Sequence, residues 1–438
     1  MLGNRDTNRR QFLKTASGAA MGLVGLPCFV PSSALGSDVG TAPSNRITMG
    51  CIGVGSRGTG NMKGFLNVPG VQVLAVCDVF RSRQQKAKQI VDQHHGTSDC
   101  TTYTDFRELL KREDIDTVMI ATQDHWHAPI AVAAARAGKD MYCEKPLGVA
   151  VTECRAILDS VRRYGRIFQT GTQQRSDRKF RFACELARNG YLGKLHTVKV
   201  ASPGPNYKPA YKGPFDPVPV PDGLDYDMYL GPAPQKPYNP GRHAWPDWYL
   251  IWDYCAGFIV NWAVHHLDIA NWGCPTAADE PFELRCKTTY RDEGFTDNVN
   301  TWNAEFRYQG GLRMTLTDYW GTNKSGCRFE GDEGWVYVDR PGIWAEPESL
   351  LKVTLKAADL HLHESNNHQR DFIESVRTRR HPVSDIEAGH KASYLGMIAE
   401  ISGRLKRTLK WDPAKEHFVG DAEANRMLTR PMRSPWNS

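Results

Sequence analysis

The sequence predicts an α/β protein whose first half contains a doubly wound parallel sheet. Short apolar runs alternate there with segments of helical pattern, a glycine-rich turn follows the first run, and an aspartate ends the second. Strands and helices that alternate at this spacing are typical of parallel sheets covered by helices. The 438 residues leave enough chain for two domains with substantial cores.

The first predicted strand, residues 46–52, runs directly into a Gly-x-Gly-x-x-Gly turn, and a predicted helix over residues 60–67 follows. In this setting the first glycine permits a tight turn, and the second lets the backbone approach a pyrophosphate. The third lets the helix pack closely on the strand, while the helix amino terminus faces the phosphate charge. The predicted dinucleotide contacts in this turn are Gly53, Gly55, Ser56, Arg57 and Gly58.

The second predicted strand, residues 71–77, ends in Asp78, about twenty residues beyond the turn. An acid at this place binds ribose hydroxyls and favours NAD, because it repels the extra phosphate of NADP. Arg81 and Arg83 follow closely and weaken that preference, so NADP stays an alternative cofactor.

The alternation continues and brings polar side chains to one edge of the sheet. Thr122, His125 and His127 follow one predicted strand, and Glu144 and Lys145 follow the next. Ligands bind at the carboxyl edge of such sheets, where Lys145 can hydrogen-bond a substrate hydroxyl and help move its proton. Two alternatives stay open: the histidines pack on a cofactor without chemistry, and Glu-Lys-Pro is an ordinary charged turn. The predicted helices are residues 105–111 and 128–137, the predicted strands are residues 115–120 and 140–143, and residues 161–170 add a further step.

A second polar cluster lies further along the chain. Asn261 and His265 are four residues apart, and His265 and Asp268 are three apart, so on a helix they share one face. Histidine is the side chain best suited to accept a proton near neutral pH, as alcohol oxidation requires. The alternative is an amphipathic helix in which Trp262 and Leu267 form core and the histidines are only hydrogen-bonded.

These motifs, in this order, resemble the glucose–fructose oxidoreductase, inositol dehydrogenase and rhizopine catabolism family (Gfo/Idh/MocA). The resemblance implies a Rossmann domain followed by an α/β domain with a large open, mostly antiparallel sheet that covers the nicotinamide. It also implies that Lys145 and His265 flank the reacting carbon. The matching segments are residues 53–58, Asp78, Ala121-Thr122 with His127, Glu144-Lys145-Pro146 and residues 256–268. The cofactor contacts that follow are Thr122, His127, Glu144 and Lys145.

Asn261 departs from the family pattern. Family members with an active dehydrogenase site usually carry aspartate four residues before this histidine. An amide can hydrogen-bond a sugar hydroxyl, but it cannot accept a proton or hold negative charge beside Lys145. We therefore predict three catalytic residues, with His265 as base, Lys145 as its helper and Asn261 orienting the substrate.

The segment between these clusters, residues 203–246, is rich in proline, glycine and aromatic residues. Long loops of this kind carry binding surfaces, and aromatic faces suit the apolar side of a sugar ring. An arm that crosses to a partner subunit is the alternative. The predicted substrate contacts are Arg242, Asp253 and His266. The later predicted elements are strands at residues 301–306 and 312–317 and helices at residues 368–376 and 389–405.

The first residues of the chain predict an export signal. Arg9 and Arg10 lie in a segment that fits the twin-arginine pattern, and residues 16–30 are modestly apolar. That stretch is too short and too broken by glycine and proline to span a membrane. A disordered basic leader is the alternative. The predicted divisions are a twin-arginine signal peptide at 1–36, a linker at 37–45, an NAD(P)-binding Rossmann domain at 46–170 and a substrate-binding and oligomerisation domain at 171–438.

Composition excludes other classes of function. The net charge of +6 is dispersed, and no basic stripe with interleaved aromatic residues predicts nucleic-acid binding. Several of the 11 cysteines fall in predicted strands, where buried free thiols are expected. His361, His363 and His368 cluster, but without an acid pattern of known metal geometry we expect a solvated loop and no metal site.

The sequence thus predicts an exported or periplasmic oxidoreductase that uses NAD, or NADP, on a sugar or glycoside hydroxyl. We expect a tightly bound cofactor, no membrane span in the mature chain and a homo-oligomer. Two alternatives stay open. One is an NAD-dependent glycoside hydrolase that works by transient oxidation and elimination, and the other is a sugar-binding protein that has lost its chemistry.

Overall fold

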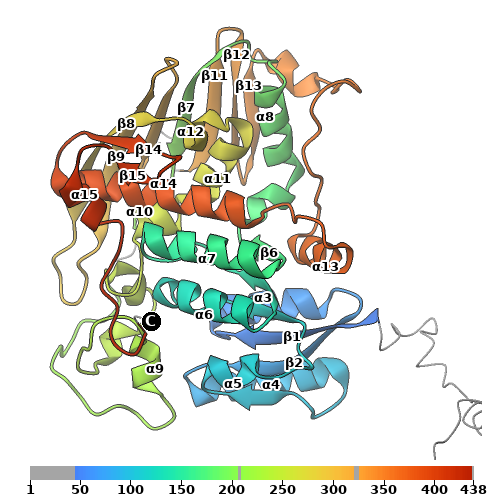
Figure 1. Ribbon diagram of the computed structural model, residues 1–438, viewed down its shortest axis with the longest axis vertical. Coiled ribbons are helices and arrows are strands. Elements are labelled where there is room, and N and C mark those ends of the chain that lie inside the picture. Colours follow the sequence, from blue (N-terminus) through green and yellow to red (C-terminus); the bar gives the residue numbers. More distant parts are fainter. Residues whose placement is uncertain (1–44, 206–208, 320–324, 437–438) are drawn as a thin grey trace, which may run out of the picture. The chain divides into compact units, whose positions relative to one another are not determined.

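A six-stranded parallel sheet forms the first part of the structure (Figure 1). The computed structural model describes residues 45–205, 209–319 and 325–436. The strand order is β3-β2-β1-β4-β5-β6 with every pair parallel, so the predicted doubly wound Rossmann sheet is confirmed. Its strands are β1 Ile47–Ile52, β2 Val71–Cys77, β3 Thr101–Tyr103, β4 Thr117–Ile120, β5 Asp140–Cys143 and β6 Phe168–Thr170. The helices between them are α3 Ser56–Leu66, α4 Arg81–His95, α5 Phe106–Leu110, α6 Asp124–Arg136 and α7 Val151–Tyr164.

Several elements differ from the sequence prediction. The sequence does not predict β3, because its three residues are threonines and a tyrosine without an apolar run. Helices α3 and α6 each begin four residues earlier than predicted, at Ser56 and Asp124. Both helices start in the polar turn that follows a strand, before any apolar periodicity is visible in the sequence.

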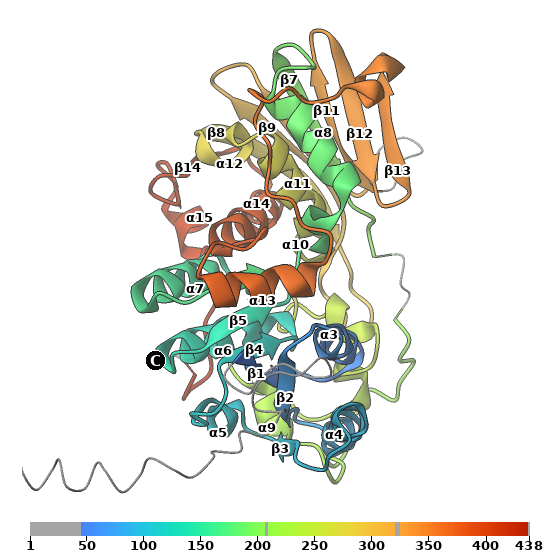
Figure 2. The same ribbon diagram turned by 90° about the vertical axis from the view of Figure 1, so that its right-hand side faces the viewer.

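The second sheet has nine strands in the order β13-β12-β11-β7-β10-β9-β8-β14-β15. Only β7 and β10 pair in parallel, so the expected mostly antiparallel sheet is confirmed. Along β8, buried and exposed residues alternate, as in a sheet with one covered face. Helices α8, α11 and α14 pack on the covered face (Figures 1 and 2). The strands are β7 Leu195–Ala201, β8 Phe282–Tyr290, β9 Val299–Tyr308, β10 Arg313–Thr317, β11 Gly326–Gly331, β12 Gly334–Asp339, β13 Gly342–Glu346, β14 Leu409–Asp412 and β15 His417–Phe418.

The helices of this second part differ widely in length. They are α8 Arg178–Arg188, α9 Tyr226–Leu230, α10 Phe258–Asn261, α11 Val264–Gly273, α12 Thr276–Asp279, α13 His368–Thr378, α14 Ile386–Leu405 and α15 Ala422–Arg426. Short 3-10 helices cover Gln173–Ser176, Pro240–Arg242, Asp247–Leu250 and Glu348–Lys352. Helix α13 returns to the first sheet, packs on α3 and places Phe372 and Ile373 in the core there (Figure 2).

Helix α14 approaches its neighbours closely because glycines recur along it every seven residues. A Cβ on Gly389 would lie 2.0 Å from Thr170 Oγ1, and one on Gly396 would lie 2.5 Å from the carbonyl oxygen of Ile259. Such contacts are too short for any side chain, so the glycines let α14 rest directly on β6 and α10. The close packing of α14 on both elements therefore fixes the position of α10 relative to β6.

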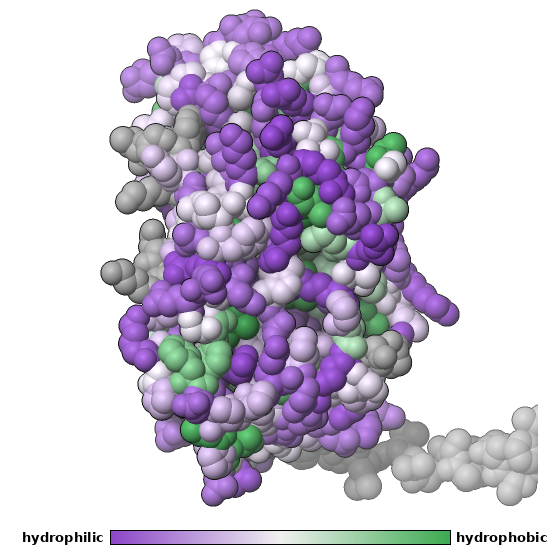
Figure 3. Space-filling model, turned by 90° about the vertical axis from the view of Figure 1, so that its left-hand side faces the viewer, coloured by the Kyte–Doolittle hydropathy of each residue, from purple (hydrophilic) through white to green (hydrophobic). Residues whose placement is uncertain are grey.

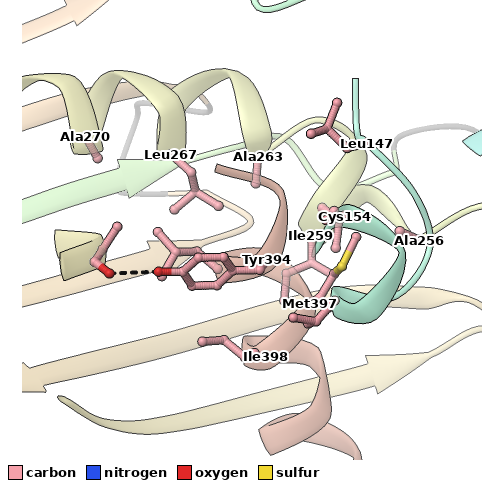
Figure 4. Close-up of a cluster of buried hydrophobic side chains, with 14 of the residues drawn as sticks. Leu147, Cys154, Ala256, Ile259, Ala263, Leu267, Ala270, Tyr394, Met397 and Ile398 are labelled. Atoms are coloured by element: carbon pink, nitrogen blue, oxygen red, sulfur yellow. Dashed lines mark hydrogen bonds between the residues drawn. The ribbon is translucent and has the colours of Figure 1, made fainter. Parts of the chain in front are cut away.

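One hydrophobic core is continuous across the two parts (Figure 4). Leu147 and Cys154, from the loop after β5 and from α7, meet Ile259 of α10 and Met397 of α14. Tyr394 of α14 donates its hydroxyl to the carbonyl of Ala278 at 2.7 Å. The loop that carries Lys145 is thus packed against the helix that carries Asn261.

Several predictions concern residues outside the described ranges. The twin-arginine signal peptide at 1–36 and all of the linker at 37–45 except its last residue lie there, and so does Tyr207 of the aromatic segment. The boundary at 170/171 stays a prediction. Among the described helices none is long and apolar enough to cross a membrane. The face in Figure 3 is largely hydrophilic, with hydrophobic side chains in small separate groups.

The cysteines and histidines give one confirmation and one correction. Every cysteine in the described ranges is a buried free thiol, as expected for those in strands. His368 does not lie in a solvated loop: it is buried at the start of α13, where its ring bonds the Thr170 carbonyl at 2.9 Å and Ser176 Oγ at 2.8 Å. The described residues contain no group of acids, cysteines and histidines arranged to hold a metal ion.

Candidate active site

A single cleft of about 960 Å³ runs along the carboxyl edge of the parallel sheet. One end lies at the glycine turn after β1, and the other is closed by residues of the second part of the chain. Predicted site residues that line it are Gly53, Gly55, Ser56, Arg57, Asp78, Thr122, His127, Glu144, Lys145, Asn261 and His265. Residues more than 200 positions apart in the sequence therefore meet in one cavity. The cavity lies at the edge where such sheets bind ligands.

The glycine turn has the shape that a dinucleotide requires. Gly53 has φ +79°, and a Cβ there would lie 2.7 Å from the Ala121 backbone. Gly58, which is buried beneath the turn, would bring a Cβ to 1.8 Å from the Gly53 carbonyl oxygen. Helix α3 begins within this motif, at Ser56, with no side-chain cap and no acid in its first turn. Its positive amino terminus is therefore available for a pyrophosphate.

Asp78 closes the far side of this end. Its Oδ2 accepts from the backbone N–H of Val54 at 2.9 Å, and its Oδ1 accepts from that of Phe80 at 3.0 Å. Burial raises the pKa of Asp78, while Arg83, 4.0 Å away, acts in the opposite direction. Each carboxylate oxygen keeps lone pairs for ribose hydroxyls. Arg83, the cation that we expect to weaken a preference for NAD, also lines the cleft.

His127 lines the cleft, but both of its ring nitrogens face backbone carbonyls. Its Nδ1 lies 2.6 Å from the Pro146 carbonyl oxygen and its Nε2 lies 3.1 Å from that of Thr122. His125 lies deeper, between the carbonyls of Tyr229 and Tyr254, and burial lowers its pKa to about 4. The interpretation of these histidines as packing residues fits this geometry better than a catalytic one.

Glu144 connects the glycine turn to the end of the cleft at Lys145. Its Oε1 accepts from Arg57 Nε at 3.0 Å, from Asn61 Nδ2 at 2.9 Å and from Gln173 Nε2 at 3.1 Å. Burial alone would raise the pKa of Glu144, but Arg57, Lys145 and these donors lower it overall. The carboxylate therefore stays charged and fixes Arg57 at the mouth of the turn.

Lys145 and Asn261 are in direct contact across the junction. Lys145 Nζ donates to both the backbone oxygen and Oδ1 of Asn261, each at 2.8 Å. Asn261 Nδ2 donates in turn to Asp124 Oδ1 at 3.0 Å and Oδ2 at 3.1 Å. Burial lowers the pKa of Lys145, and the charges of Glu144 and Asp124 oppose that effect. An ammonium has three N–H donors, so one remains for a ligand in the cleft.

His265 completes this end of the cleft. The side chain is buried, its ring lies 5.7 Å from that of Trp262, and its Nδ1 has no hydrogen-bond partner among the described residues. Burial lowers the pKa of His265 well below 6.5, and Lys145 and Arg340 lower it further. The imidazole is therefore neutral near pH 7 and able to accept a proton.

The helix that the sequence predicts for these residues is broken. Helix α10 ends at Asn261 and α11 begins at Val264, although both residues of the pair still face the cleft. Asp268 does not share their face. It is fully buried and forms a two-bond ion pair with Arg175, both bonds 2.7 Å long, which anchors α11 to the segment that carries Gln173.

The three predicted substrate contacts do not line the cleft. His266 follows His265 on the helix and points the other way, with Nε2 2.8 Å from Ser325 Oγ. Arg242 stacks on the Phe295 ring at 4.4 Å, and Asp253 also lies outside the cleft lining. Contacts between side chains, which the sequence does not show, decide which of the predicted substrate residues reach the cleft.

Other residues line the end of the cleft near Asn261 and His265. Trp245 of the aromatic segment lines the cleft, and so do Trp248 and Tyr249, which follow the segment and whose rings stack at 3.8 Å. Arg340, in the turn between β12 and β13, lies over the Trp262 ring at 4.9 Å and forms no ion pair with a described carboxylate. No local motif marks Arg340, and only the position of its strand pair relative to α10 brings it here.

Comparisons with known proteins agree on the fold and on the kind of cofactor. Residues 47–172 match the GFO_IDH_MocA family, described as an oxidoreductase family with an NAD-binding Rossmann fold, and residues 180–438 match the C-terminal alpha/beta domain of the same family. The aldose-aldose oxidoreductase of Caulobacter crescentus, solved with glycerol, superposes with a TM-score of 0.62 at 19% identity, over 83% of this chain and 99% of that one. The scyllo-inositol dehydrogenase of Lactobacillus casei, solved with NAD(H) and scyllo-inositol, has a TM-score of 0.58 at 14% identity, over 83% and 99% of the two chains.

Among curated proteins, the alpha-N-acetylgalactosaminidase of Shewanella oneidensis is 32% identical over 206 residues. The match covers 43% of this chain and 44% of that protein, so this chain spans less than half the length of that relative. Proteins called glycosyl hydrolase family 109 protein, from other Shewanella strains, match over the same share.

Proposed function

The chain belongs to the Gfo/Idh/MocA oxidoreductase family, and from that premise we propose that it transfers hydride between a nicotinamide cofactor and a hydroxyl of a sugar or glycoside. The observation that carries this proposal is one cleft that joins the glycine turn to Lys145 and His265. The cradle made by Gly53 and Gly58 fits a dinucleotide, which supplies the hydride acceptor when it is bound.

Lys145, His265 and Asn261 have different functions at the substrate hydroxyl. Lys145 directs its remaining N–H to the hydroxyl oxygen and stabilises the negative charge that grows on it. His265, neutral and with a ring nitrogen to spare, accepts the hydroxyl proton. Asn261 holds the lysine through two hydrogen bonds and so fixes the position of the oxygen.

The substrate end suits a sugar ring. Trp245, Trp248 and Trp262 offer apolar faces, while Arg340 offers donors for hydroxyl groups. Aromatic and polar groups that converge in a cleft of this size are typical of small-molecule sites.

A second candidate is net hydrolysis of a glycoside. Temporary oxidation of a ring hydroxyl acidifies the neighbouring C–H, which permits elimination of the glycosidic oxygen, addition of water and return of the hydride. The similarity to an alpha-N-acetylgalactosaminidase over 206 residues is the observation that favours it. Both candidates use Lys145 and His265 in the same way.

Mass spectrometry of products from a mixed panel of glycosides separates these reactions. A product lighter by two hydrogens, with its glycosidic bond intact, supports the dehydrogenase. Free sugar without net oxidation supports the hydrolase instead. If neither appears with added NAD or NADP while ligand still binds, the protein is a sugar binder and both proposals fail.

We also propose, from the sequence, export by the twin-arginine route, a tightly held cofactor and homo-oligomeric assembly. A reporter fused to residues 1–45 should be exported, and replacing Arg9 and Arg10 with lysine should block that export. Nucleotide released when the purified protein is denatured tests the tight cofactor binding. The mass of the native protein in light scattering tests the homo-oligomeric assembly.

A further inference from the structure

A buried carboxylate lies directly behind Asn261. Asp124 is the first residue of α6 and only 1% exposed. Its two oxygens accept from Asn261 Nδ2 at 3.0 and 3.1 Å, and Oδ2 also accepts from the backbone N–H of Ala256 at 3.2 Å. Because Asn261 Oδ1 accepts from Lys145, an unbroken hydrogen-bonded chain runs from Lys145 through Asn261 to Asp124.

The chemistry of its neighbours fixes the orientation of the Asn261 amide. A lysine ammonium only donates hydrogen bonds and a carboxylate only accepts them. The amide oxygen must therefore face Lys145 and the amide nitrogen must face Asp124. An aspartate at position 261 would bring a second carboxylate against Asp124 at hydrogen-bond distance, where two negative charges oppose each other.

We propose that Asp124 is the positioning residue that supplies the negative charge for Lys145 through Asn261. Position 261 holds an asparagine because the carboxylate comes next along this hydrogen-bonded chain, at Asp124. The proposal rests on the proposed function. The amino terminus of α6 stabilises a negative charge at Asp124. Burial lowers the pKa of Lys145 and Asp124 opposes that effect, so Asp124 helps to keep the ammonium that the hydroxyl oxygen needs.

Other charges nearby do not replace Asp124. Glu144 also opposes the effect of burial on Lys145, but it accepts no hydrogen bond from Lys145 or Asn261. Its donors are Arg57, Asn61, Tyr142 and Gln173. Among the described residues, Asp124 is the carboxylate that hydrogen bonds connect to Lys145. The remaining titratable groups that act on Lys145 or Asp124 are Arg57, Cys255, His265, Cys143 and Glu153.

The test measures the protonation of Lys145 directly in the full chain. Labelling of Lys145 by acetic anhydride is followed against pH by peptide mass spectrometry in the wild type, Asp124→Asn, Asn261→Asp and the double variant. Asp116→Asn, the same change at the exposed amino end of β4, is the matched control. Thermal melting confirms that each variant is folded.

We expect Asp124→Asn to lower the labelling midpoint of Lys145 by roughly half to one pH unit, because an opposing charge is lost. The double variant, which moves the carboxylate to position 261, should return the midpoint to the wild-type value or above it. Asn261→Asp alone should lower the melting temperature, and Asp116→Asn should change nothing.

An unchanged midpoint in Asp124→Asn, or a double variant that stays as low as the single one, overturns the proposal. If Asp124→Asn does not fold, the double variant and Asn261→Asp still decide: a double variant no more stable than Asn261→Asp contradicts the charge exchange. The labelling needs no turnover, so a shifted midpoint in a protein that turns over no sugar would refute the proposed function alone.

Discussion

The two ends of the cleft are built in different ways. The dinucleotide end comes from one strand–turn–helix unit and the next strand, and its key contacts are backbone contacts around Gly53 and Gly58. The other end joins Lys145, Asp124 and Asn261 from three segments through side-chain hydrogen bonds. Substitutions should therefore act through shape at the first end and through charge at the second.

The largest effect is expected from Lys145→Ala. Turnover should fall by roughly 10²–10⁴-fold, the range for loss of a group that handles a proton in the transition state. Affinity for NAD should fall much less than turnover, because Lys145 is one cofactor contact among several and the glycine turn is untouched. Stopped-flow rates and calorimetric NAD titration measure the two quantities separately. Lys111→Ala, an exposed lysine paired with Glu108, is the control; equal losses of rate and NAD affinity would show that the two ends are not separable.

Gly58→Ala tests the other end by shape alone. A Cβ 1.8 Å from the Gly53 carbonyl forces α3 away from the turn. Overpacking of this kind costs roughly 1–3 kcal/mol, so NAD affinity should fall about 10–100-fold. Gly310→Ala, where a Cβ meets nothing within 4 Å, should leave the affinity unchanged. A Gly58→Ala protein with wild-type affinity would contradict the close approach at this turn.

Asp78→Ser should change the choice of cofactor. Removal of the carboxylate ends the repulsion of a 2′-phosphate and frees Arg83, 4.0 Å away, to bind it. The ratio of NAD to NADP affinity should fall by roughly tenfold, as expected for one hydrogen bond to a charged group. Fluorescence titration with both cofactors measures this ratio, and an unchanged ratio in Asp78→Ser would remove Asp78 from cofactor selection.

The smallest predicted effect is a shift in pH dependence with Arg340→Ala. His265 accepts a proton only when it is neutral, and its pKa lies well below 6.5. The neutral form therefore persists as the pH falls below 6.5 and is lost only at the lowered pKa. Without the Arg340 charge that pKa rises, so the acid limb of kcat/KM should move to higher pH by less than about one unit. A limb that moves to lower pH would show that Arg340 does not act on His265.

The sequence predicts the parallel sheet and the dinucleotide turn well, because both depend on local pattern. It misses β3, where three polar residues pair at the sheet edge without an apolar run. It also fails for Arg242, Asp253 and His266, which pack elsewhere. Side-chain contacts such as that of Arg242 with Phe295 decide the orientation of these residues, and His266 faces away because it is one position beyond His265 on the helix. Neither cause is visible in composition or spacing.

The sequence by itself determined the order of the elements, the glycine turn, Asp78 and the presence of Lys145 and His265 beside the cofactor site. Only the tertiary structure decided that Arg340 reaches the cleft and that Asp124 stands behind Asn261. Backbone turns and strand–helix alternation follow from neighbouring residues, whereas the charge around a buried lysine depends on side chains brought together from distant segments. For that reason the sequence showed an amide where a carboxylate was expected, and the fold showed a carboxylate hydrogen-bonded behind it.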